Sequence, residues 1–526
     1  MKTNLYQWRG AVPSSIVALV GCLLLALATP GHAVVEPPDG VTLSGTQVRL
    51  AWEGAVEGDI HDVQVALDTG STDPFLEPIL DERTQHGRIV VKDGVTFGNS
   101  YVWRVRPVSD DIPGDWSLLS SFAIMTVPLD FSLDIEVING EGQPQPGLTI
   151  FNHCDSIVGY DLNGELALLL QTKERVSDCR VIGNGQLLYV GGGQAWIVDL
   201  TGDVVWASPD DENFKVHHSA SMMPSGNVLM VVRDYRDIDQ DGVVRTWQGD
   251  RIVEMNPLTN EIVWDWSTFD HYTTEDYDIH QTNHWNDWTH VNDAHYVEAD
   301  NSIYISCRHL SRITRIDYDT GKIIYNMGMD FASGDVPFGD DLFSYQHSPM
   351  LLSNGNMVLF DNGNRRGGGP VGQDGSSFAI ELAFTGSPPS AAEIVWSWQP
   401  PEYCPSTGDA NRMENGNTLV TATQLSGVYE ITEAGEIAWR LSILANEACP
   451  GLRPGYRATR VADLYLEDIE IPCQGDLDGD GEVGVDDLLA LLSQWGGSGT
   501  ADLDLSGEVE VNDVLIMLQK WGPCGS

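Results

Sequence analysis

Basic residues are scarce in this chain of 526 residues. It has 28 Lys and Arg residues against 77 Asp and Glu residues, which gives a formal net charge of -49 at pH 7. A field of this sign repels phosphate backbones and anionic lipid headgroups, and we therefore exclude nucleic acid as a partner. An anionic substrate would have to be held by a local group of Arg and His side chains that works against this field.

Long hydrophobic runs are missing beyond the N-terminus. Lys2 and Arg9 precede an apolar run over residues 16–28, and Gly31-His32-Ala33 offers a cleavage site of small residues. This pattern predicts a secretory signal peptide over residues 1–33. The run is shorter than a transmembrane helix of about 20 residues, so we expect an exported protein, periplasmic or at the cell surface, that does not span the membrane. Lipidation at Cys22 is a less favoured alternative.

Cysteine is also rare, with eight residues in the whole chain. In an oxidising compartment, proximity in sequence suggests three disulfides, although sequence alone does not fix the connectivity. The suggested pairs are Cys154 with Cys179, Cys404 with Cys449, and Cys473 with Cys524. Cys307 is then the odd residue, either a buried thiol or a neighbour of a reactive site.

Residues 34–128 have the pattern of short half-buried strands. Apolar and polar residues alternate over 48–52, 61–67 and 101–106, between turns rich in Gly, Asp and Pro. Alternation of this kind is typical of a β-sandwich. The segment resembles a fibronectin type III domain, which implies a spacer or adhesive module.

Residues 129–470 carry an internal repeat. A turn followed by a short strand with one bulky residue recurs six times, and it alternates with a Gly-Asn-like turn that runs into an apolar strand. The bulky residues are Leu168, Trp206, Trp264, Tyr325, Trp396 and Trp439. Radial repetition of four-stranded sheets would produce this alternation. We therefore predict an all-β fold in which a β-sandwich precedes a six-bladed β-propeller.

Residues 473–526 contain two acidic loops, 26 residues apart, each followed by an apolar segment of helical period. Each loop has oxygen ligands on alternate residues, Gly at the sixth place and Asp at the twelfth, which is the pattern that Ca²⁺ requires. The predicted metal ligands are Asp476, Asp478, Asp480, Glu482, Asp487, Asp502, Asp504, Ser506, Glu508 and Asp513. We predict a small α-helical calcium-binding module. It resembles a type I dockerin, which implies docking to a cohesin-like partner.

Histidine and arginine recur at matching places in the propeller repeat. His218 precedes Asn227 by nine positions, and His347 precedes Asn356 by nine, so the two histidines should be equivalent on different blades. Arg233, Arg308 and Asn362 share a second register, at the far end of the inner strands. The blade with Arg308 is entered by His290 and Asn292. A funnel lined by histidine and arginine suits a small anion.

Four stretches in order carry a resemblance to the bacterial arylsulfotransferases. These stretches are His217-His218 with Pro224–Asn227, Trp288–Asn292, Ser306–Arg308 running to Gly321, and Gln346-His347 with Ser353–Asn356 and Asp361–Gly363. The resemblance implies sulfuryl transfer from a phenolic sulfate ester to a phenolic acceptor, through a covalent histidine intermediate and without a nucleotide sulfate donor.

The resemblance also implies roles for individual residues. His347 would be the nucleophile, and His290, Asn292 and Arg308 would bind the sulfuryl oxygens. His218 would complete the anion pocket or move the phenolic proton. Further substrate-binding candidates are Asn362, Arg233 and His217, the last less favoured by the register.

Two alternatives stay open. The protein could be an aryl sulfatase that uses water as the acceptor, or a non-catalytic extracellular propeller that serves as a binding scaffold. His271, His280 and His284 lie in an insertion rich in Tyr and Asp. They could form a lid or a metal cluster, and a solvated loop is the interpretation we prefer.

Overall fold

The structure is a computed structural model, and most of the chain between residues 35 and 523 is described. The described residues are 35–52, 60–109, 111–129, 131, 133–240, 242–281, 283–365, 375–401, 403–422, 427–445, 455–466, 475, 477, 482–497, 501, 503, 509–519 and 521–523. The predicted signal peptide and the Cys22 lipidation site lie outside them. Among the helices that are described, none has the length and apolarity needed to cross a bilayer.

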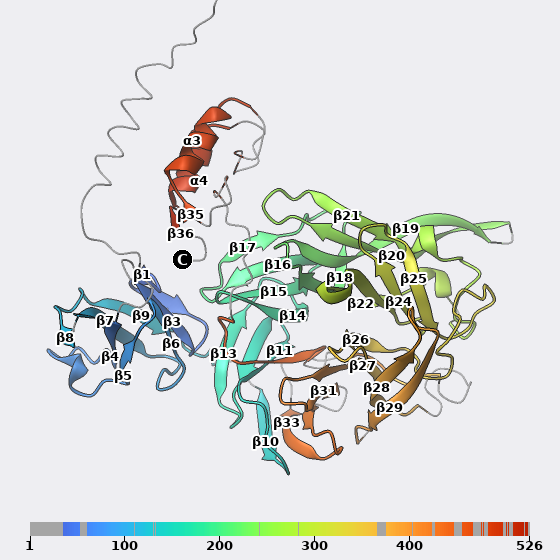
Figure 1. Ribbon diagram of the computed structural model, residues 1–526, viewed down its shortest axis with the longest axis horizontal. Helices are drawn as coiled ribbons and strands as arrows, with labels where there is room; N and C mark the ends of the chain where they lie inside the picture. The colour runs from blue at the N-terminus through green and yellow to red at the C-terminus, as the bar shows by residue number, and fades with distance from the viewer. Residues whose placement is uncertain are drawn as a thin grey trace, which may run out of the picture.

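The N-terminal part is built from two sheets (Figure 1). One contains β1 (Val35–Glu36), β3 (Val48–Trp52) and β6 (Arg88–Val91). The other runs in the order β2 (Val41–Leu43), β9 (Ser120–Ile124), β7 (Ser100–Ser109), β4 (Ile60–Leu67) and β5 (Leu80–Thr84), with β8 (Ile112–Pro113) on β7 and a short helix η1 (Pro74–Leu76) between β4 and β5. Alternate residues of β4 and β7 are buried between the sheets, Val63, Val65, Tyr101 and Trp103 among them. The predicted alternation of apolar and polar residues therefore has a direct structural cause.

Six further sheets follow in the described part of the chain. The first contains β11 (Leu148–His153), β12 (Ser156–Tyr160), β13 (Leu166–Gln171) and β34 (Ala458–Val461). The second contains β14 (Val176–Gly183), β15 (Gln186–Gly191), β16 (Gln194–Asp199) and β17 (Val204–Ala207). The third contains β18 (Val216–Met222), β19 (Val228–Gln240), β20 (Val243–Met255) and β21 (Ile262–Ser267).

The fourth contains β22 (Val291–Val297), β23 (Ser302–Cys307), β24 (Arg312–Asp317) and β25 (Ile323–Gly328). The fifth contains β26 (His347–Leu351), β27 (Met357–Asp361), β28 (Phe378–Thr385) and β29 (Ala391–Trp398). The sixth contains β10 (Asp134–Asn139), β30 (Asp409–Arg412), β31 (Thr418–Ala422), β32 (Gly427–Ile431) and β33 (Ile437–Ala445). Short helices α2 (Thr268–His271), η2 (His284–Asn286) and η3 (Glu298–Asp300) lie in the connections.

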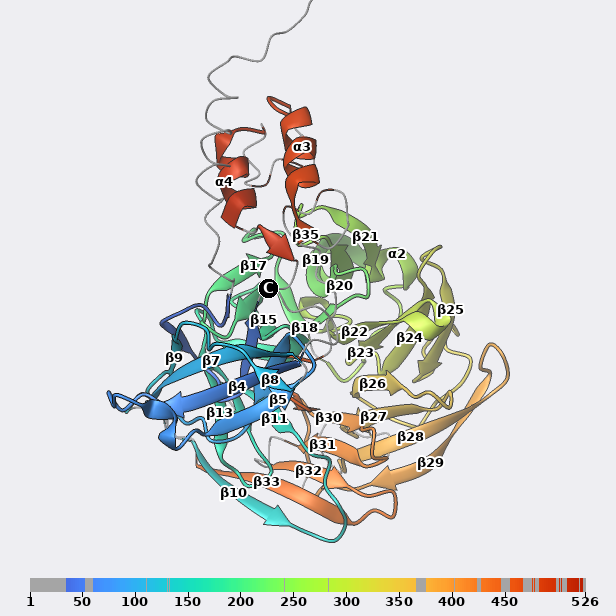
Figure 2. The ribbon, with the colours of Figure 1, turned by 60° about the vertical axis from the view of Figure 1, so that its left-hand side comes forward.

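Successive sheets pack against one another around a common centre (Figure 2). One strand of each sheet contacts a strand of the next sheet, in the order β11, β14, β18, β22, β26 and β30. The series is closed by a contact between β31 of the sixth sheet and β34 of the first sheet. A separate hydrophobic cluster fills each space between neighbouring sheets. Inner strands such as β23 and β27 are therefore buried on both faces and read as apolar runs, whereas the outer strand β29 is largely exposed.

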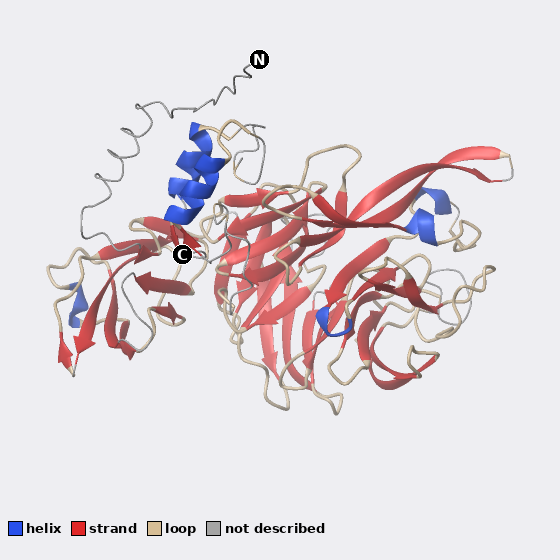
Figure 3. Cartoon of the chain, turned by 45° about the horizontal axis from the view of Figure 1, so that its top comes forward, coloured by secondary structure: helices blue, strands red, loops and turns tan. Residues whose placement is uncertain are grey.

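The six bulky residues of the sequence repeat all lie on one kind of strand. They fall on β13, β17, β21, β25, β29 and β33, one strand in each of the six sheets. The repeat thus marks the same place in every sheet. The wide spacing between Trp206 and Trp264 is explained by the long β19–β20 hairpin, which projects from the ring of sheets (Figure 3), and that between Trp264 and Tyr325 by the insertion between β21 and β22.

The N-terminal sheets share a hydrophobic core with the first two sheets of the ring. Ser44 N donates to Leu200 O at 2.7 Å, and Leu169 N donates to Ser44 O at 2.9 Å. Gly45 makes a bridge with Leu168, and a Cβ atom there would lie 2.8 Å from Leu464 Cδ1. The contact is close and largely apolar, so the N-terminal part is anchored to the ring.

The two C-terminal loops are near copies of each other. Helices α3 (Val485–Ser493) and α4 (Val511–Gln519) lie side by side, and β35 (Glu482–Val483) pairs with β36 (Gly522–Pro523). Asp487 accepts hydrogen bonds from Leu477 N at 2.6 Å and Gly484 N at 2.7 Å. Asp513 accepts from Leu503 N and Glu510 N at the same two distances. The predicted ligands Asp476, Asp478, Asp480, Asp502, Asp504, Ser506 and Glu508 lie outside the described residues.

Two predicted disulfides are wrong. Cys179 is a buried free thiol in β14, packed among apolar residues of the first two sheets, so it is not the partner of Cys154. Cys404 also keeps its thiol, which donates to Ser406 O at 3.4 Å. Proximity in sequence fails as a guide here because consecutive segments belong to different sheets. Cys449, Cys473 and Cys524 lie outside the described residues, and Cys307 is a buried thiol in β23.

Candidate active site

The first strands of three sheets are irregular where they carry the candidate residues. The register shifts between Val216 and Ala220 in β18, between Val291 and Asp293 in β22, and between His347 and Met350 in β26. His218 and His290 have left-handed backbones, with φ of 58° and 48°. Bulges and left-handed non-glycine residues re-aim side chains at a cost in strain, which is common at functional sites.

These irregularities bring the predicted histidines together. The ring centroids of His218 and His290 are 4.5 Å apart. The ring of Tyr456 lies between the sheets, 5.7 Å from His218 and 5.8 Å from His347. His309, which the sequence analysis did not single out, lies 4.4 Å from His290. Side chains from separate sheets therefore meet in one cluster, as the register of the repeat predicted.

The imidazole of His347 is held in one tautomer. His347 is buried, and its Nδ1 lies 2.6 Å from Asn362 Oδ1. The amide nitrogen of Asn362 donates to Cys404 O at 2.7 Å and to Thr407 O at 2.8 Å, so its oxygen must face the ring. His347 Nδ1 therefore donates, and Nε2 keeps its lone pair. Burial and the nearby Arg308 lower the pKa of His347 to about 3, so the ring is neutral near pH 7.

Asn362 was predicted to bind substrate, and the geometry gives it a different place. It is completely buried, and its side-chain oxygen and nitrogen are both engaged by protein atoms. It therefore acts by orienting His347. Asn292 is also completely buried, and its Nδ2 donates to Gln346 O at 2.8 Å, next to His347 in the chain.

His290 is oriented by a carboxylate instead of an amide. Its Nδ1 lies 2.5 Å from Asp287 Oδ2. The backbone oxygen of the same Asp287 accepts from His309 Nδ1 at 2.6 Å. Burial, followed by the charges of His309 and Arg308, holds the pKa of His290 well below its usual range. Asp287 therefore holds both His290 and His309 through hydrogen bonds, which accounts for the close grouping of these three side chains.

Arg308 brings the positive charge. Its backbone N donates to His290 O at 3.0 Å, its Nη2 donates to Pro405 O at 3.0 Å, and its guanidinium stacks on Tyr345 at 4.6 Å. No carboxylate within the described ranges forms an ion pair with it, in contrast to Arg312 and Arg315. A half-buried guanidinium without an acidic partner is a strong anion-binding group in a protein of such negative charge.

The two other predicted substrate-binding residues are placed differently: the ring of His217 packs against that of His218 with centroids 5.0 Å apart, and Arg233 lies apart from the cluster. His217 Nε2 lies 2.9 Å from Asp250 Oδ1, and Asp250 also accepts from Val291 N at 2.7 Å. His217 thus belongs to a buried structural contact beside the cluster. Arg233 is exposed, and no contact of its side chain with the histidines occurs among the described residues. The repeat predicted the position of Arg233 along its strand correctly. On the neighbouring strand of the same sheet, however, no described histidine lies opposite Arg233.

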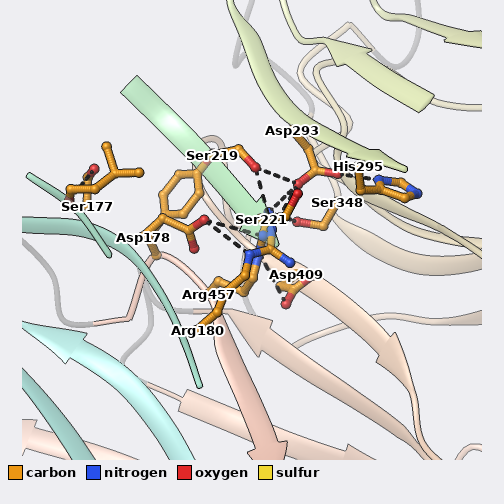
Figure 4. Close-up of polar contacts among 12 residues, drawn as sticks. Ser177, Asp178, Arg180, Ser219, Ser221, Asp293, His295, Ser348, Asp409 and Arg457 are labelled. Carbon is orange, nitrogen blue, oxygen red and sulfur yellow. Dashed lines mark hydrogen bonds and ion pairs between the residues drawn. The ribbon is translucent and has the colours of Figure 1, made fainter. Parts of the chain in front are cut away.

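A layer of buried charge adjoins the site, and Figure 4 shows its residues. Arg457 Nη2 donates to Asp293 Oδ1 at 2.7 Å, and Arg180 reaches the same oxygen at 3.4 Å. Asp178 and Asp409 complete the layer, and burial raises the pKa of each to about 7. Members of this layer follow site residues in the chain: Ser219 follows His218, Asp293 follows Asn292, Ser348 follows His347, and Arg457 follows Tyr456. Each inner segment therefore supplies one residue to the site and the next to its support.

The insertion after β21 is a packed part of the site wall. Arg312 and Asp276 form a completely buried ion pair of 2.6 Å, and Tyr345 and Arg365 both donate to Asp278. The insertion is therefore only partly solvated, since these acidic residues are buried whereas His271 and His280 are exposed. His271 and His284 stack on Trp266 and Tyr277, so they do not form a metal cluster.

Solved structures with low sequence identity resemble the chain. A protein of unknown function from Bacteroides caccae has 10% identity and a TM-score of 0.37, over 59% of this chain and 99% of that one. A streptogramin B lyase has 12% identity and a TM-score of 0.35, over 60% and 88%. The β-propeller domain of Cps50 (Swd1) from Myceliophteria thermophila has 12% identity and a TM-score of 0.32, over 59% and 100%. No curated protein matches this chain.

The family comparison is specific. The family described as arylsulfotransferase (ASST) matches residues 134–439, which is more than half of the chain and contains His218, His290, Arg308 and His347. Tyr456 and Arg457 lie beyond the matched residues. The chain belongs to the arylsulfotransferase family, which implies aryl sulfotransfer without a nucleotide sulfate donor.

Proposed function

We propose that the protein is an exported aryl-sulfate sulfotransferase that works by a ping-pong mechanism. A phenolic sulfate ester transfers its sulfuryl group to His347, and the resulting sulfohistidine transfers it to a phenolic acceptor. The observation that carries this proposal is the hydrogen bond from His347 Nδ1 to Asn362 Oδ1, because it leaves Nε2 with an unshared pair in the cluster of histidines and Arg308. A neutral imidazole of this kind is a competent nucleophile.

The surrounding charge suits the transition state. Sulfuryl transfer resembles phosphoryl transfer, in which attacking and leaving atoms are roughly in line and charge lies on the peripheral oxygens. The guanidinium of Arg308, which has no acidic partner among the described residues, and the N–H group of His218 are available to those oxygens. Such preorganised donors contribute most of the rate enhancement in reactions of this type. One of the neighbouring histidines takes the proton of the acceptor phenol.

The experiment that tests the proposal is intact-mass measurement after brief exposure to 4-nitrophenyl sulfate. We expect a burst of 4-nitrophenol equal to the enzyme concentration and a sulfuryl adduct on the peptide with His347. The His347→Asn variant should fold and show neither. A matched control is His271→Asn, which removes an exposed histidine outside the site. Steady release of free sulfate at a rate that phenol does not change would instead assign the protein as an aryl sulfatase.

We also propose that the six sheets of the ring are the blades of a six-bladed β-propeller. Two observations support this architecture: strands of successive sheets are in contact, and a hydrophobic cluster lies between neighbouring sheets. The N-terminal pair of sheets, residues 34–128, would be a fibronectin type III-like module. Its shared core with the ring favours a fixed support over a free adhesive domain.

For the C-terminal module we propose two calcium sites and docking to a cohesin-like protein. The support is the duplication, since Asp487 and Asp513 bind the backbone of their loops in the same way. Carboxylate and carbonyl oxygens on alternate residues are the ligands that Ca²⁺ prefers, and the ion would hold each loop closed on its helix. The N-terminal sequence supports export to the periplasm or the cell surface.

A further inference from the structure

The histidines of the site differ in the hydrogen-bond partner of Nδ1, the ring nitrogen that faces away from the site. For His347 the partner is an amide oxygen, that of Asn362 at 2.6 Å. For His290 it is a carboxylate oxygen, that of Asp287 at 2.5 Å. For His218, no hydrogen bond to either ring nitrogen occurs among the described residues, and its ring is held by stacking. Three histidines in one cluster thus have three different electrostatic supports.

We infer that Asp287 and His290 form the dyad that accepts the proton of the phenolic acceptor, with Asp287 as a positioning residue. This inference rests on the proposed sulfohistidine mechanism and adds the identity of the base. The Nδ1–H group of His290 donates to the carboxylate, so its Nε2 is the atom that accepts a proton. When that proton arrives, the positive charge forms beside a carboxylate that compensates it.

The carboxylate is itself held in place. The backbone oxygen of Asp287 accepts from His309 Nδ1, and Gln248 Nε2 donates to Asp287 Oδ1 at 3.3 Å. Its Oδ2 is thereby left for His290. The ring of His309 packs against that of His290, with centroids 4.4 Å apart and planes tilted by 35°, which restricts rotation of the His290 ring. The neighbours therefore fix the distance between carboxylate and imidazole.

The neutral partner of His347, the amide of Asn362, has a matching explanation. Transfer to Nε2 of His347 makes a positively charged, sulfated imidazole ring, and a carboxylate on Nδ1 would stabilise that intermediate. Asn362 carries no charge, so the sulfuryl group stays easy to transfer. A neutral partner suits the nucleophile and an anionic partner suits the base.

The step balances as follows. The bond between sulfur and His347 Nε2 breaks, and its electron pair returns to Nε2. The bond between sulfur and the acceptor oxygen forms as the O–H proton of the acceptor passes to His290 Nε2. His290 then gives this proton to the phenolate that leaves the next donor, or to water, and the enzyme returns to its starting state.

The test separates the two half-reactions in the Asp287→Asn variant. Stopped-flow release of 4-nitrophenol from 4-nitrophenyl sulfate reports the first, because 4-nitrophenolate leaves without a proton. Decay of the adduct after addition of phenol, followed by intact mass, reports the second. We expect the burst rate to change less than about threefold, and adduct decay to slow by about 10² to 10⁴-fold, the usual contribution of general base catalysis.

A second readout uses acceptor acidity. Acceptors that are already ionised at pH 8 and are not the leaving group of the donor, such as 2-nitrophenol, need no base, so they should restore adduct decay in Asp287→Asn to within about tenfold of the wild-type rate. The matched control is Glu275→Gln, which removes an exposed charge from the same insertion and should leave both steps unchanged.

The inference is overturned if Asp287→Asn slows both half-reactions equally, which is the mark of a purely structural role, or if it slows neither. It is also overturned if ionised acceptors are no better than phenol. A wild-type enzyme that gives neither burst nor adduct would instead refute the proposed function, so the two failures are distinguishable.

Discussion

Arg457 donates a hydrogen bond of 3.0 Å to Ser348 Oγ, and Ser348 directly follows His347 in the chain. Ser348 has a left-handed backbone with φ of 50°, so the turn that carries His347 is held by a guanidinium. The same guanidinium pairs with Asp293 at 2.7 Å and lies 3.5 Å from Asp178. Arg457 therefore joins strand β26, which carries His347, to the buried charge layer.

Replacement of Arg457 by Met should destabilise the ring strongly. The change leaves Asp178, Asp293 and Asp409 buried with one arginine fewer, and loss of one partner from a buried ionic group costs about 3–5 kcal/mol. Urea unfolding followed by tryptophan fluorescence measures the difference. Arg233→Met removes an exposed arginine and should stay within about 0.5 kcal/mol of the wild type. Equal stability of the two variants would contradict the structural role of the charge layer.

Replacement of Asn362 should change the nucleophile without removing it. In Asn362→Ala the Nδ1–H of His347 loses its acceptor and the ring can adopt the other tautomer, so we expect adduct formation to slow about 10 to 100-fold. In Asn362→Asp the carboxylate should stabilise the charged sulfohistidine, and the adduct should persist longer in the presence of phenol. Rapid-quench intact mass measures both effects. An Asp variant with faster adduct decay would contradict this account.

The burst should be independent of pH from about 5 to 8. Burial and Arg308 lower the pKa of His347 to about 3, so its ring is neutral across this range and is protonated only in stronger acid. A histidine with an ordinary pKa of about 6.5 would lose about nine-tenths of the burst rate by pH 5.5. Stopped-flow release of 4-nitrophenol at each pH distinguishes the two. A fall centred near pH 6.5 would show that the nucleophile is more exposed to water than its burial indicates.

Removal of calcium should unfold the C-terminal module and leave catalysis intact. That module has a small core of its own, formed by residues such as Val483, Leu491, Val509 and Met517, and this core is separate from those of the ring. Without the ion the acidic loops repel one another. Limited proteolysis with and without EGTA, combined with the burst assay, measures the two effects. Simultaneous loss of activity would show that the module supports the site.

The repeat in the sequence predicted much of the fold because its period has a physical cause. Trp206 and Trp396 mark the same strand in different sheets, and the apolar runs before them are strands buried on both faces. Registering these segments was sufficient to bring His218, His290, His347 and Arg308 into one site. Each prediction used only strand-to-strand equivalence, which the ring of sheets preserves.

The remaining site residues had no such signal. Asp287 lies in a non-repeating insertion, and its role depends on the turn that carries its carboxylate to His290. Tyr456 and Arg457 come from a segment after the repeat and reach the centre because β34 joins the first sheet. Arg233 shows the opposite error, since equivalence along a strand did not predict whether the side chain is exposed.

The ring is fastened at both of its ends, because β10 pairs with β33 and β34 pairs with β11. Tyr456 and Arg457 come just before β34, so they are delivered to the centre only when this final fastening is made. During synthesis or export, His347 therefore emerges before Tyr456 and Arg457, the residues that pack against its ring and hold its turn. We therefore expect the site to be complete only after β34 has paired with β11 of the first sheet.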